Sequence, residues 1–226
     1  RQEMSVIRTT AAVAALAGLA LFTTPAQAQY SESSAWITPF AGGYFGGSFT
    51  PVSNSYGVTK LDVGSAFTFG VRLGYKFNPS IGLVFEYAHA DPTMTIKCGT
   101  LGADSICNQS LDLSSNIYEG TFNFYFGSTP QTQGYIAIGG GASNMGASAT
   151  LNGQTVKGSS TQFSTVFGLG GTKMFNEKVG MTLDGRYRWV NVNGADSYYC
   201  YYYCYAYDTS WYGSGEITLG VKYQFK

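Results

Sequence analysis

The sequence predicts an all-β protein, an eight-stranded antiparallel β-barrel that crosses a membrane with its strands. Two observations lead to this prediction. Apolar and polar side chains alternate along successive segments, and the connections between those segments are alternately short and long. Alternation with a period of two is typical of strands whose two faces meet different surroundings. After the first 28 residues, no apolar run is long enough for a membrane-spanning helix.

The composition excludes several classes of protein. The 226 residues carry 13 Lys and Arg against 13 Asp and Glu, so the formal net charge is zero. Charged residues make up 12% of the chain and aromatic residues 16%, with 30 glycines. A nucleic-acid partner is not expected, because binding one requires a basic face. The aromatic content also argues against a disordered chain, and the length allows a single domain.

Residues 1–28 have the layout of a secretory signal peptide, with Met4 as the expected start. A short positive region precedes the apolar stretch Ala11–Phe22, which is shorter than the roughly 20 residues of a spanning helix. An A-x-A motif ends at Ala28, so cleavage is expected there and residues 29–226 form the barrel. An uncleaved N-terminal anchor is the alternative.

Five segments show the alternation clearly. They are Val63–Phe77, Ser80–Ala90, Leu113–Phe126, Val179–Val190 and Gly215–Phe225. One face of each carries large apolar side chains and no charge, and the other face holds all the charged residues. These are Arg72, Lys76, Glu86, Glu119, Asp184, Arg186, Arg188, Glu216 and Lys222.

Three further strands are predicted on weaker patterns, over Ser34–Gly46, Gly134–Ala147 and Thr161–Phe175. Pro39 interrupts the first, which predicts a bulge or an edge at that point. Lys173 falls on the apolar face of the third, where a lysine near a membrane interface can extend its ammonium group to water.

The connections divide into two kinds. Asn78-Pro79, Gly127–Gln133 and Asn176–Lys178 are short. The long ones are Gly47–Asp62, Asp91–Asp112, Ser148–Ser160 and Asn191–Ser210. We expect the short turns at the periplasmic rim and the long loops at the extracellular rim.

The two faces favour a membrane barrel over a soluble one. In a soluble barrel the apolar face packs inward, whereas in an outer-membrane barrel it meets lipid and the polar face lines the interior. Aromatic residues at the strand ends are typical of membrane girdles. A lipocalin-like barrel in the periplasm is the alternative.

The chain resembles the small eight-stranded outer-membrane barrels of the OmpA-like and opacity-like porin family, without a periplasmic domain. The resemblance rests on the order and spacing of FGVRLGYKFN (Phe69–Asn78), GLVFEYAHAD (Gly82–Asp91), MTLDGRYRWVNV (Met181–Val192) and EITLGVKYQF (Glu216–Phe225). It implies a place in the outer membrane of a Gram-negative bacterium, in contact with outer-membrane lipid and lipopolysaccharide.

The final strand resembles the assembly signal of that family. The resemblance implies that Tyr223 and Phe225 are recognised by the barrel-assembly machinery. Lys226 departs from the family pattern by following the phenylalanine.

The interior charges lead to two interpretations. Five positive and four negative side chains in a barrel of eight strands are expected to fill it as a salt-bridged network, because unpaired buried charge is costly. The alternative is a narrow gated ion or small-solute channel, in which a pair such as Arg72–Glu119 exchanges partners. A wide pore is excluded because it needs about sixteen strands.

Four cysteines lie in two of the long loops, Cys98 with Cys107 and Cys200 with Cys204. Disulfides persist outside the cytoplasm, and four cysteines allow three pairings. Pairing within each loop is the first expectation and pairing across the loops the second. Neither a metal site nor a cofactor is expected.

The fourth long loop is rich in tyrosine. A recognition role is predicted for Tyr198, Tyr199, Tyr201, Tyr202, Tyr203, Tyr205, Tyr207 and Trp211. Tyrosine is a contact residue of binding loops because it is large, amphipathic and loses little entropy on ordering. The alternative is that these rings extend the strands and pack on one another.

Three functions follow from these observations. The first is a surface protein that recognises an extracellular ligand or host surface, or adheres to it, through its loops. The second is the narrow channel. The third is a lipid A-modifying enzyme, which needs a serine near His89, the single histidine, and no serine lies within eight residues of it. The prediction is that the protein is not an enzyme.

Overall fold

A computed structural model describes residues 34–49, 58–98, 110–129, 131–151, 154–192 and 210–225. The strands are β1 (Ser34–Phe45), β2 (Ser48–Phe49), β3 (Val58–Val63), β4 (Ser65–Asn78), β5 (Ile81–Ala90), β6 (Thr93–Cys98), β7 (Ser110–Thr129), β8 (Thr132–Leu151), β9 (Gln154–Met174), β10 (Val179–Val192) and β11 (Ser210–Phe225). No helix in these ranges is long and apolar enough to cross a membrane.

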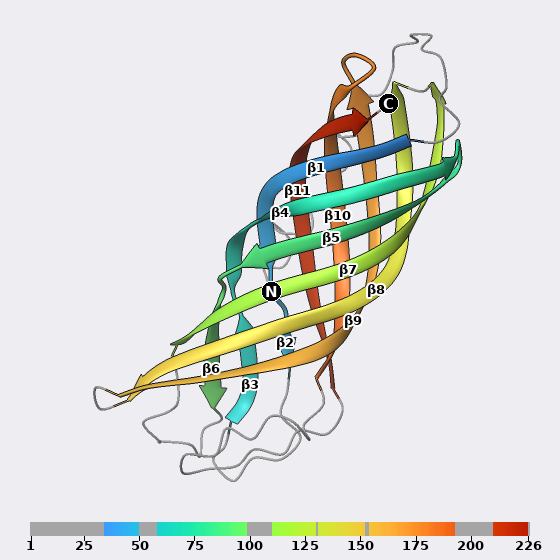
Figure 1. Ribbon diagram of the computed structural model, residues 1–226. Coiled ribbons are helices and arrows are strands. Elements are labelled where there is room, and N and C mark those ends of the chain that lie inside the picture. The colour runs from blue at the N-terminus through green and yellow to red at the C-terminus, as the bar shows by residue number, and fades with distance from the viewer. Residues whose placement is uncertain are drawn as a thin grey trace, which may run out of the picture.

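Eight of the strands close into a barrel (Figure 1). Antiparallel pairs join β1, β4, β5, β7, β8, β9, β10 and β11 in that order, and β11 pairs back onto β1. Closure satisfies the backbone hydrogen bonds that an open sheet edge would leave unmade in lipid. The predicted eight-stranded antiparallel barrel is therefore confirmed.

The barrel has two different ends. We call the end with the short connections β4–β5, β7–β8 and β9–β10 the short-turn rim, and the opposite end the loop rim. At the loop rim, β2, β3 and β6 continue the wall beyond the barrel: β3 pairs with β2 and with β6, and β6 pairs with the start of β7. Two segments predicted as loops, Gly47–Asp62 and Asp91–Asp112, thus contain short strands.

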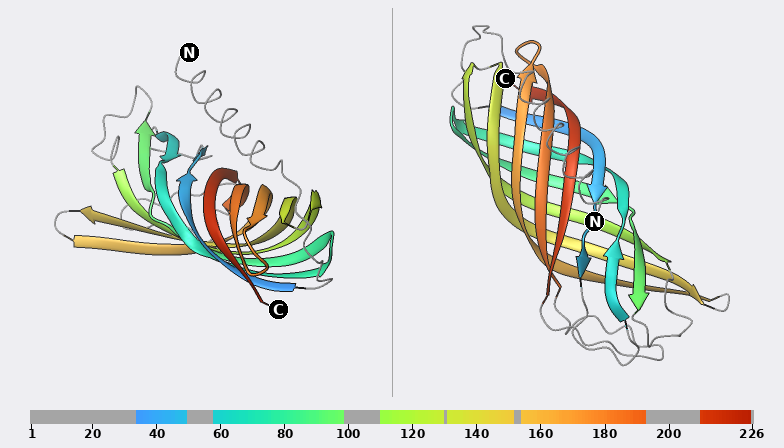
Figure 2. Two further views of the ribbon diagram at one scale, coloured as in Figure 1. Left: turned by 90° about the horizontal axis from the view of Figure 1, so that it is seen from above. Right: turned by 180° about the vertical axis from the view of Figure 1, so that it is seen from behind.

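The prediction of a long loop over Ser148–Ser160 is wrong. Strands β8 and β9 pair residue by residue as far as Leu151 opposite Gln154. The two residues between them, Asn152-Gly153, are the dipeptide most favoured in tight hairpins, a signal obscured by the polar composition of the flanks. Because β9 pairs with β10 only from Ser164 onward, the hairpin projects from the loop rim (Figure 2).

The outer wall is apolar, as the alternation predicted. Large apolar side chains stand exposed along it, among them Phe67, Phe85 and Leu219, each more than half exposed. Lys173 is exposed on the same face, next to the short-turn rim. The nine charged side chains of the opposite face are all buried in the interior, each with 7% or less of its surface exposed.

Strand β1 places three aromatic side chains in the interior. Trp36, Phe40 and Tyr44 are each 5% exposed or less. The Trp36 ring lies against Gly74 of β4, where a side chain would collide with the indole, so a glycine is required there. Pro39 marks neither a bulge nor an edge, since pairing with β11 resumes at Phe40 in the same register.

Candidate functional site: the barrel interior

The middle of the barrel holds an ion network of seven buried side chains. Its members are Arg72, Glu86, Glu119, Asp184, Arg186, Arg188 and Glu216, each 4% exposed or less. They come from β4, β5, β7, β10 and β11, so the network connects strands around the whole barrel. Three arginines and four carboxylates give it a formal charge of −1 (3 − 4).

Arg188 lies at the centre of this network. Its Nη2 is 2.6 Å from Glu86 Oε1, its Nε is 2.9 Å from Glu119 Oε1, and its Nη1 is 2.9 Å from Glu216 Oε2. The planar guanidinium presents several donors in fixed directions, so one arginine can satisfy three carboxylates on three strands.

The other two arginines complete the ion network. Arg186 Nε donates to Asp184 Oδ1 at 2.8 Å, and its Nη1 lies 3.2 Å from Glu86 Oε2. Arg72 Nε donates to the same Glu86 oxygen, and its Nη2 lies 3.2 Å from Asp184 Oδ1 and 3.5 Å from Glu216 Oε1. Because every carboxylate has an arginine partner, the ion pairs offset the free-energy cost of burying these charges.

Two aromatic residues hold the ion network in place. Tyr135 of β8 donates from its hydroxyl to Asp184 Oδ2 at 2.5 Å. The ring of Phe40 lies 4.0 Å from the guanidinium carbon of Arg72. Neighbouring strands leave room for these rings: the Tyr135 ring covers Gly170 of β9, where a Cβ would collide with it.

Lys76 and Lys222 were predicted to belong to the same network, and both are buried in the interior with it. They form a separate layer nearer the short-turn rim, which we call the lysine pair. Lys76 Nζ donates to Gln133 Oε1 at 2.8 Å and lies 4.3 Å from the Tyr125 ring centroid. Lys222 Nζ lies 4.2 Å from the Trp36 ring centroid. Both lie closer to the ends of β4 and β11 than Arg72 and Glu216 of the ion network.

The pair proposed to exchange partners, Arg72 and Glu119, is not a direct contact. Arg72 binds Glu86, Asp184 and Glu216, whereas Glu119 binds Arg188. Both residues belong to the ion network but through different partners.

Apolar side chains close the interior on the loop side of the ion network. This loop-side cap consists of Phe40, Tyr44, Val63, Ala88, Ala90, Ile117, Val190 and Tyr212. The hydroxyls of Tyr44 and Tyr212 are 2.8 Å apart, so β1 and β11 are joined across the cap. From one rim to the other, the interior therefore contains the lysine pair, the ion network and the loop-side cap.

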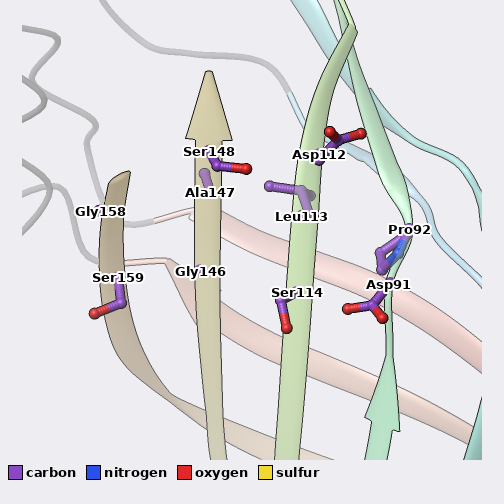
Figure 3. A pocket seen from close by; sticks show the side chains of 10 residues that line it. All are labelled: Asp91, Pro92, Asp112, Leu113, Ser114, Gly146, Ala147, Ser148, Gly158 and Ser159. Carbon is purple, nitrogen blue, oxygen red and sulfur yellow. The ribbon is translucent and has the colours of Figure 1, made fainter. Parts of the chain in front are cut away.

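A hollow of about 670 Å³ lies at the loop rim, at the base of the β8–β9 hairpin. Figure 3 shows its lining: Asp91, Pro92, Asp112, Leu113, Ser114, Gly146, Ala147, Ser148, Gly158 and Ser159. Two carboxylates and three hydroxyls lie among its lining residues. No group of His, Cys, Asp or Glu in the described ranges has the arrangement of a metal site.

The surface of β3 and β6 carries a small ion cluster near this rim. Asp62 lies 2.7 Å from Lys60 Nζ and 2.7 Å from Lys97 Nζ. Hydrogen bonds from Lys60 and Lys97 to the carboxylate lower the pKa of Asp62 below its usual value. Cys98 ends β6 and is disulfide-bonded.

Several predicted residues lie outside the described ranges. These are Cys107, Cys200, Cys204 and the tyrosines Tyr198–Tyr207. The cysteine pairing and the recognition loop therefore stay predictions. Trp211 was assigned to that loop, but it lies in β11 and is half exposed on the outer wall. Tyr223 and Phe225 stand exposed on β11 with ring centroids 5.3 Å apart.

His89 has two polar partners, and neither is a serine. Its Nδ1 is 2.9 Å from Asn116 Oδ1, and its Nε2 is 3.1 Å from Asp91 Oδ2. The ring also packs on Phe69, with the centroids 5.3 Å apart.

Aromatic residues of the interior were not among the residues predicted to face it. Trp36, Tyr44, Tyr135 and Tyr212 are all 5% exposed or less. For Tyr212 a signal was present, because it shares its parity along the strand with Glu216 and Lys222. An aromatic residue separated from buried charged residues by an even number of positions is expected to face the same side of the strand.

Comparisons with known proteins agree with this architecture. The sequence model described as outer membrane protein beta-barrel domain matches residues 14–225. The chain belongs to that family and is an outer-membrane β-barrel of a Gram-negative bacterium. No curated protein sequence gives a significant match.

Solved structures share the fold at low sequence identity. OprG of Pseudomonas aeruginosa is 14% identical with a TM-score of 0.56, and 89% of this chain aligns with 99% of that one. Neisserial surface protein A is 16% identical with a TM-score of 0.52, over 86% and 100%. The outer membrane protease OmpT of Escherichia coli is 10% identical with a TM-score of 0.50, over 88% and 99%.

Proposed function

We propose that this protein is a surface-exposed outer-membrane barrel whose filled interior is a rigid support and whose loop rim contacts an extracellular ligand or host surface. The main support for this proposal is the filled interior of the barrel. The ion network and the loop-side cap occupy the barrel in successive layers, and their members are buried. A barrel of eight strands has an interior just wide enough for its own side chains. Recognition is then left to the structures outside the membrane.

The loop rim supports a recognition role in two ways. The β8–β9 hairpin and the β3–β6 pair project beyond the barrel, and the hollow lies at the base of the hairpin. In the sequence, the tyrosine-rich segment 198–207 falls between β10 and β11. Tyrosine-rich loops on a rigid scaffold are typical of recognition surfaces.

Bacterial adhesion tests this proposal. Cells expressing the protein are bound to cultured epithelial monolayers, and every tyrosine in 198–207 is replaced by serine while Cys200 and Cys204 are kept. We expect membrane insertion to be unchanged and adhesion to be lost. The matched control is Tyr187→Ser, which removes an exposed tyrosine from the barrel wall and leaves the loop intact. Adhesion that survives the loop replacement contradicts the proposal.

A narrow channel is the second candidate, and the buried hydroxyls favour it. Thr38, Thr68 and Ser115 have hydroxyl oxygens that are buried without a hydrogen-bond partner. Buried polar groups of this kind are commonly satisfied by internal water, which an ion path also requires. The loop-side cap argues against continuous conduction, since its apolar side chains would have to move. Conductance across a planar bilayer distinguishes the two functions.

We assign no enzymatic activity to the site. His89 hydrogen-bonds to Asn116 and Asp91, and among the residues that the structure describes neither partner is a nucleophilic hydroxyl. The protease OmpT shares the barrel fold at 10% identity, and fold alone does not carry an activity. Unaltered lipid A in expressing cells, measured by mass spectrometry, is the expected result. Modified lipid A that is lost with His89→Ala would overturn this assignment.

A further inference from the structure

The β8–β9 hairpin presents an open strand edge at the loop rim. β8 pairs with one edge of β9 along the whole hairpin, whereas β10 pairs with the other edge only from Ser164 onward. Over Gln154–Thr161, no strand in the described part of the chain pairs with that second edge. This stretch of β9 therefore offers backbone N–H and C=O groups to a further strand.

The edge is regular and carries little protection. Natural sheets protect exposed edges with very short strands, prolines, bulges or charged side chains. The edge stretch of β9 pairs with β8 residue by residue, without a register shift, and it contains no proline. Lys157 is its one charged residue. A long and regular edge of this kind is a template for antiparallel pairing with another strand.

An identical strand fits this edge. Gly158, Ser159, Ser160 and Thr161 follow one another along it, so its second half is small and uncharged, and Ser159 is exposed. Small side chains let a second strand approach closely and bring no like charges together. Two identical edges that pair antiparallel are also self-complementary, because the donors of each meet the acceptors of the other across a two-fold axis.

We propose that two copies of this chain associate by antiparallel pairing of their β9 edges, across a two-fold axis at Ser159. In this register Ser159 lies opposite Ser159 of the second copy, and Gly158 lies opposite Ser160. Lys157 lies opposite Thr161 rather than opposite itself. Like charges directly opposite each other destabilise a strand pair, and this register avoids that arrangement.

The projection of the hairpin allows this contact. The left view of Figure 2 shows β8 and β9 reaching out beyond the barrel wall. Two copies can therefore join these strands into one sheet outside the barrels, without contact between their apolar outer walls. The pairing is separate from the recognition proposed for residues 198–207, because a change in β9 leaves that segment unaltered.

Charges placed at Ser159 test the pairing. Two differently tagged preparations of the full protein are purified from outer membranes in detergent and mixed over a range of concentrations, and their association is measured by co-purification. We expect the parent copies to co-purify. A cross-strand charge pair changes association by about 1.5- to fivefold. Ser159→Asp mixed with itself, or Ser159→Lys with itself, should weaken association by such a factor, and the mixture of the two variants should strengthen it.

Ser65 provides the matched control. It is an exposed serine at the loop end of β4, away from β9. Ser65→Asp and Ser65→Lys should associate as the parent does, alone or mixed. Equal association of the like-charged and the oppositely charged Ser159 pairs overturns the proposal. A parent protein that stays monomeric over the whole concentration range overturns it too, and leaves the edge to a different partner.

A crosslink in intact cells tests the same axis without detergent. A cysteine on the two-fold axis meets the cysteine of the second copy, so Ser159→Cys is expected to give a disulfide-linked dimer. The product is detected as a band of doubled mass that disappears on reduction. Ser65→Cys should give no more of this band than the parent. Equal amounts of dimer in the two cysteine variants contradict the pairing of the β9 edges.

Discussion

Arg188 Nη2 lies 2.6 Å from Glu86 Oε1, although the two residues are 102 positions apart in the sequence. Arg188 comes from β10 and Glu86 from β5, which are not neighbours in the barrel. Their contact therefore crosses the interior rather than following the sheet. Both side chains are buried, so this ion pair is shielded from salt and connects opposite parts of the wall.

Arg188→Met tests the central position of this arginine. The change leaves Glu86, Glu119 and Glu216 without one of their donors, and breaking a buried ion pair from one side costs about 3–5 kcal/mol. We expect a fall of that size in the free energy of unfolding, measured with urea in lipid vesicles. Lys173→Met is the control and should lie within about 0.5 kcal/mol of the parent. Equal stability of the two variants would show that the ion network does not support the barrel.

Tyr135→Phe removes one hydrogen bond to the ion network while keeping the ring. Asp184 then loses the hydroxyl donor at 2.5 Å, and a hydrogen bond to a charged group contributes about 1.5–3 kcal/mol. We expect a loss of stability in that range. Tyr75→Phe, on the outer wall, removes a hydroxyl without touching the network and should change little. A Tyr135→Phe protein as stable as Tyr75→Phe contradicts the assignment.

Gly170→Ala tests whether the ring of Tyr135 needs the space that the missing side chain of Gly170 leaves on β9. A Cβ at Gly170 would collide with that ring, so the tyrosine must move away from Asp184. Overpacking of this kind typically costs about 1–3 kcal/mol. Gly185→Ala is the matched control, because a Cβ there meets backbone oxygens only at 3.8 and 4.0 Å. Equal stability of the two alanine variants would contradict the packing argument.

Leu219→Lys tests whether the outer face of β11 meets the lipid. Leu219 lies near the middle of β11 and is 52% exposed. A lysine facing the middle of the bilayer destabilises a membrane barrel by about 2–4 kcal/mol, and by about 0–1 near the interface. Trp211→Lys, at the loop end of the same strand, should therefore be much milder. Equal costs at the two positions would mean that β11 does not cross the bilayer in this orientation.

The sequence predicts the wall of this barrel well, because each residue of a strand faces one of only two sides. The nine charges chosen from their parity, from Arg72 to Lys222, are all buried. The order of the strands around the barrel follows from hairpin connections between consecutive strands. The family resemblance agrees with the match over residues 14–225.

The interior contacts could not be predicted in the same way. Which carboxylate Arg72 contacts depends on how deep each side chain lies in the barrel and on the stagger between strands. The alternation of faces along a strand gives neither of these. Trp36 and Phe40 of β1 point inward because Gly74 and Gly70 of β4 leave room for their rings, a pairing fixed only by the register. The Asn-Gly dipeptide between β8 and β9 in the sequence favours a hairpin, but the polar residues on either side of it resemble a loop.

Single-channel conductance in planar bilayers tests most directly the claim that the interior is a filled support. The protein is purified from outer membranes, and its folding is checked by the heat-dependent shift of its gel band. We predict no discrete openings, and no change with Glu119→Gln. Repeatable openings of fixed size in the parent protein, altered by Glu119→Gln, would contradict the account and establish the channel.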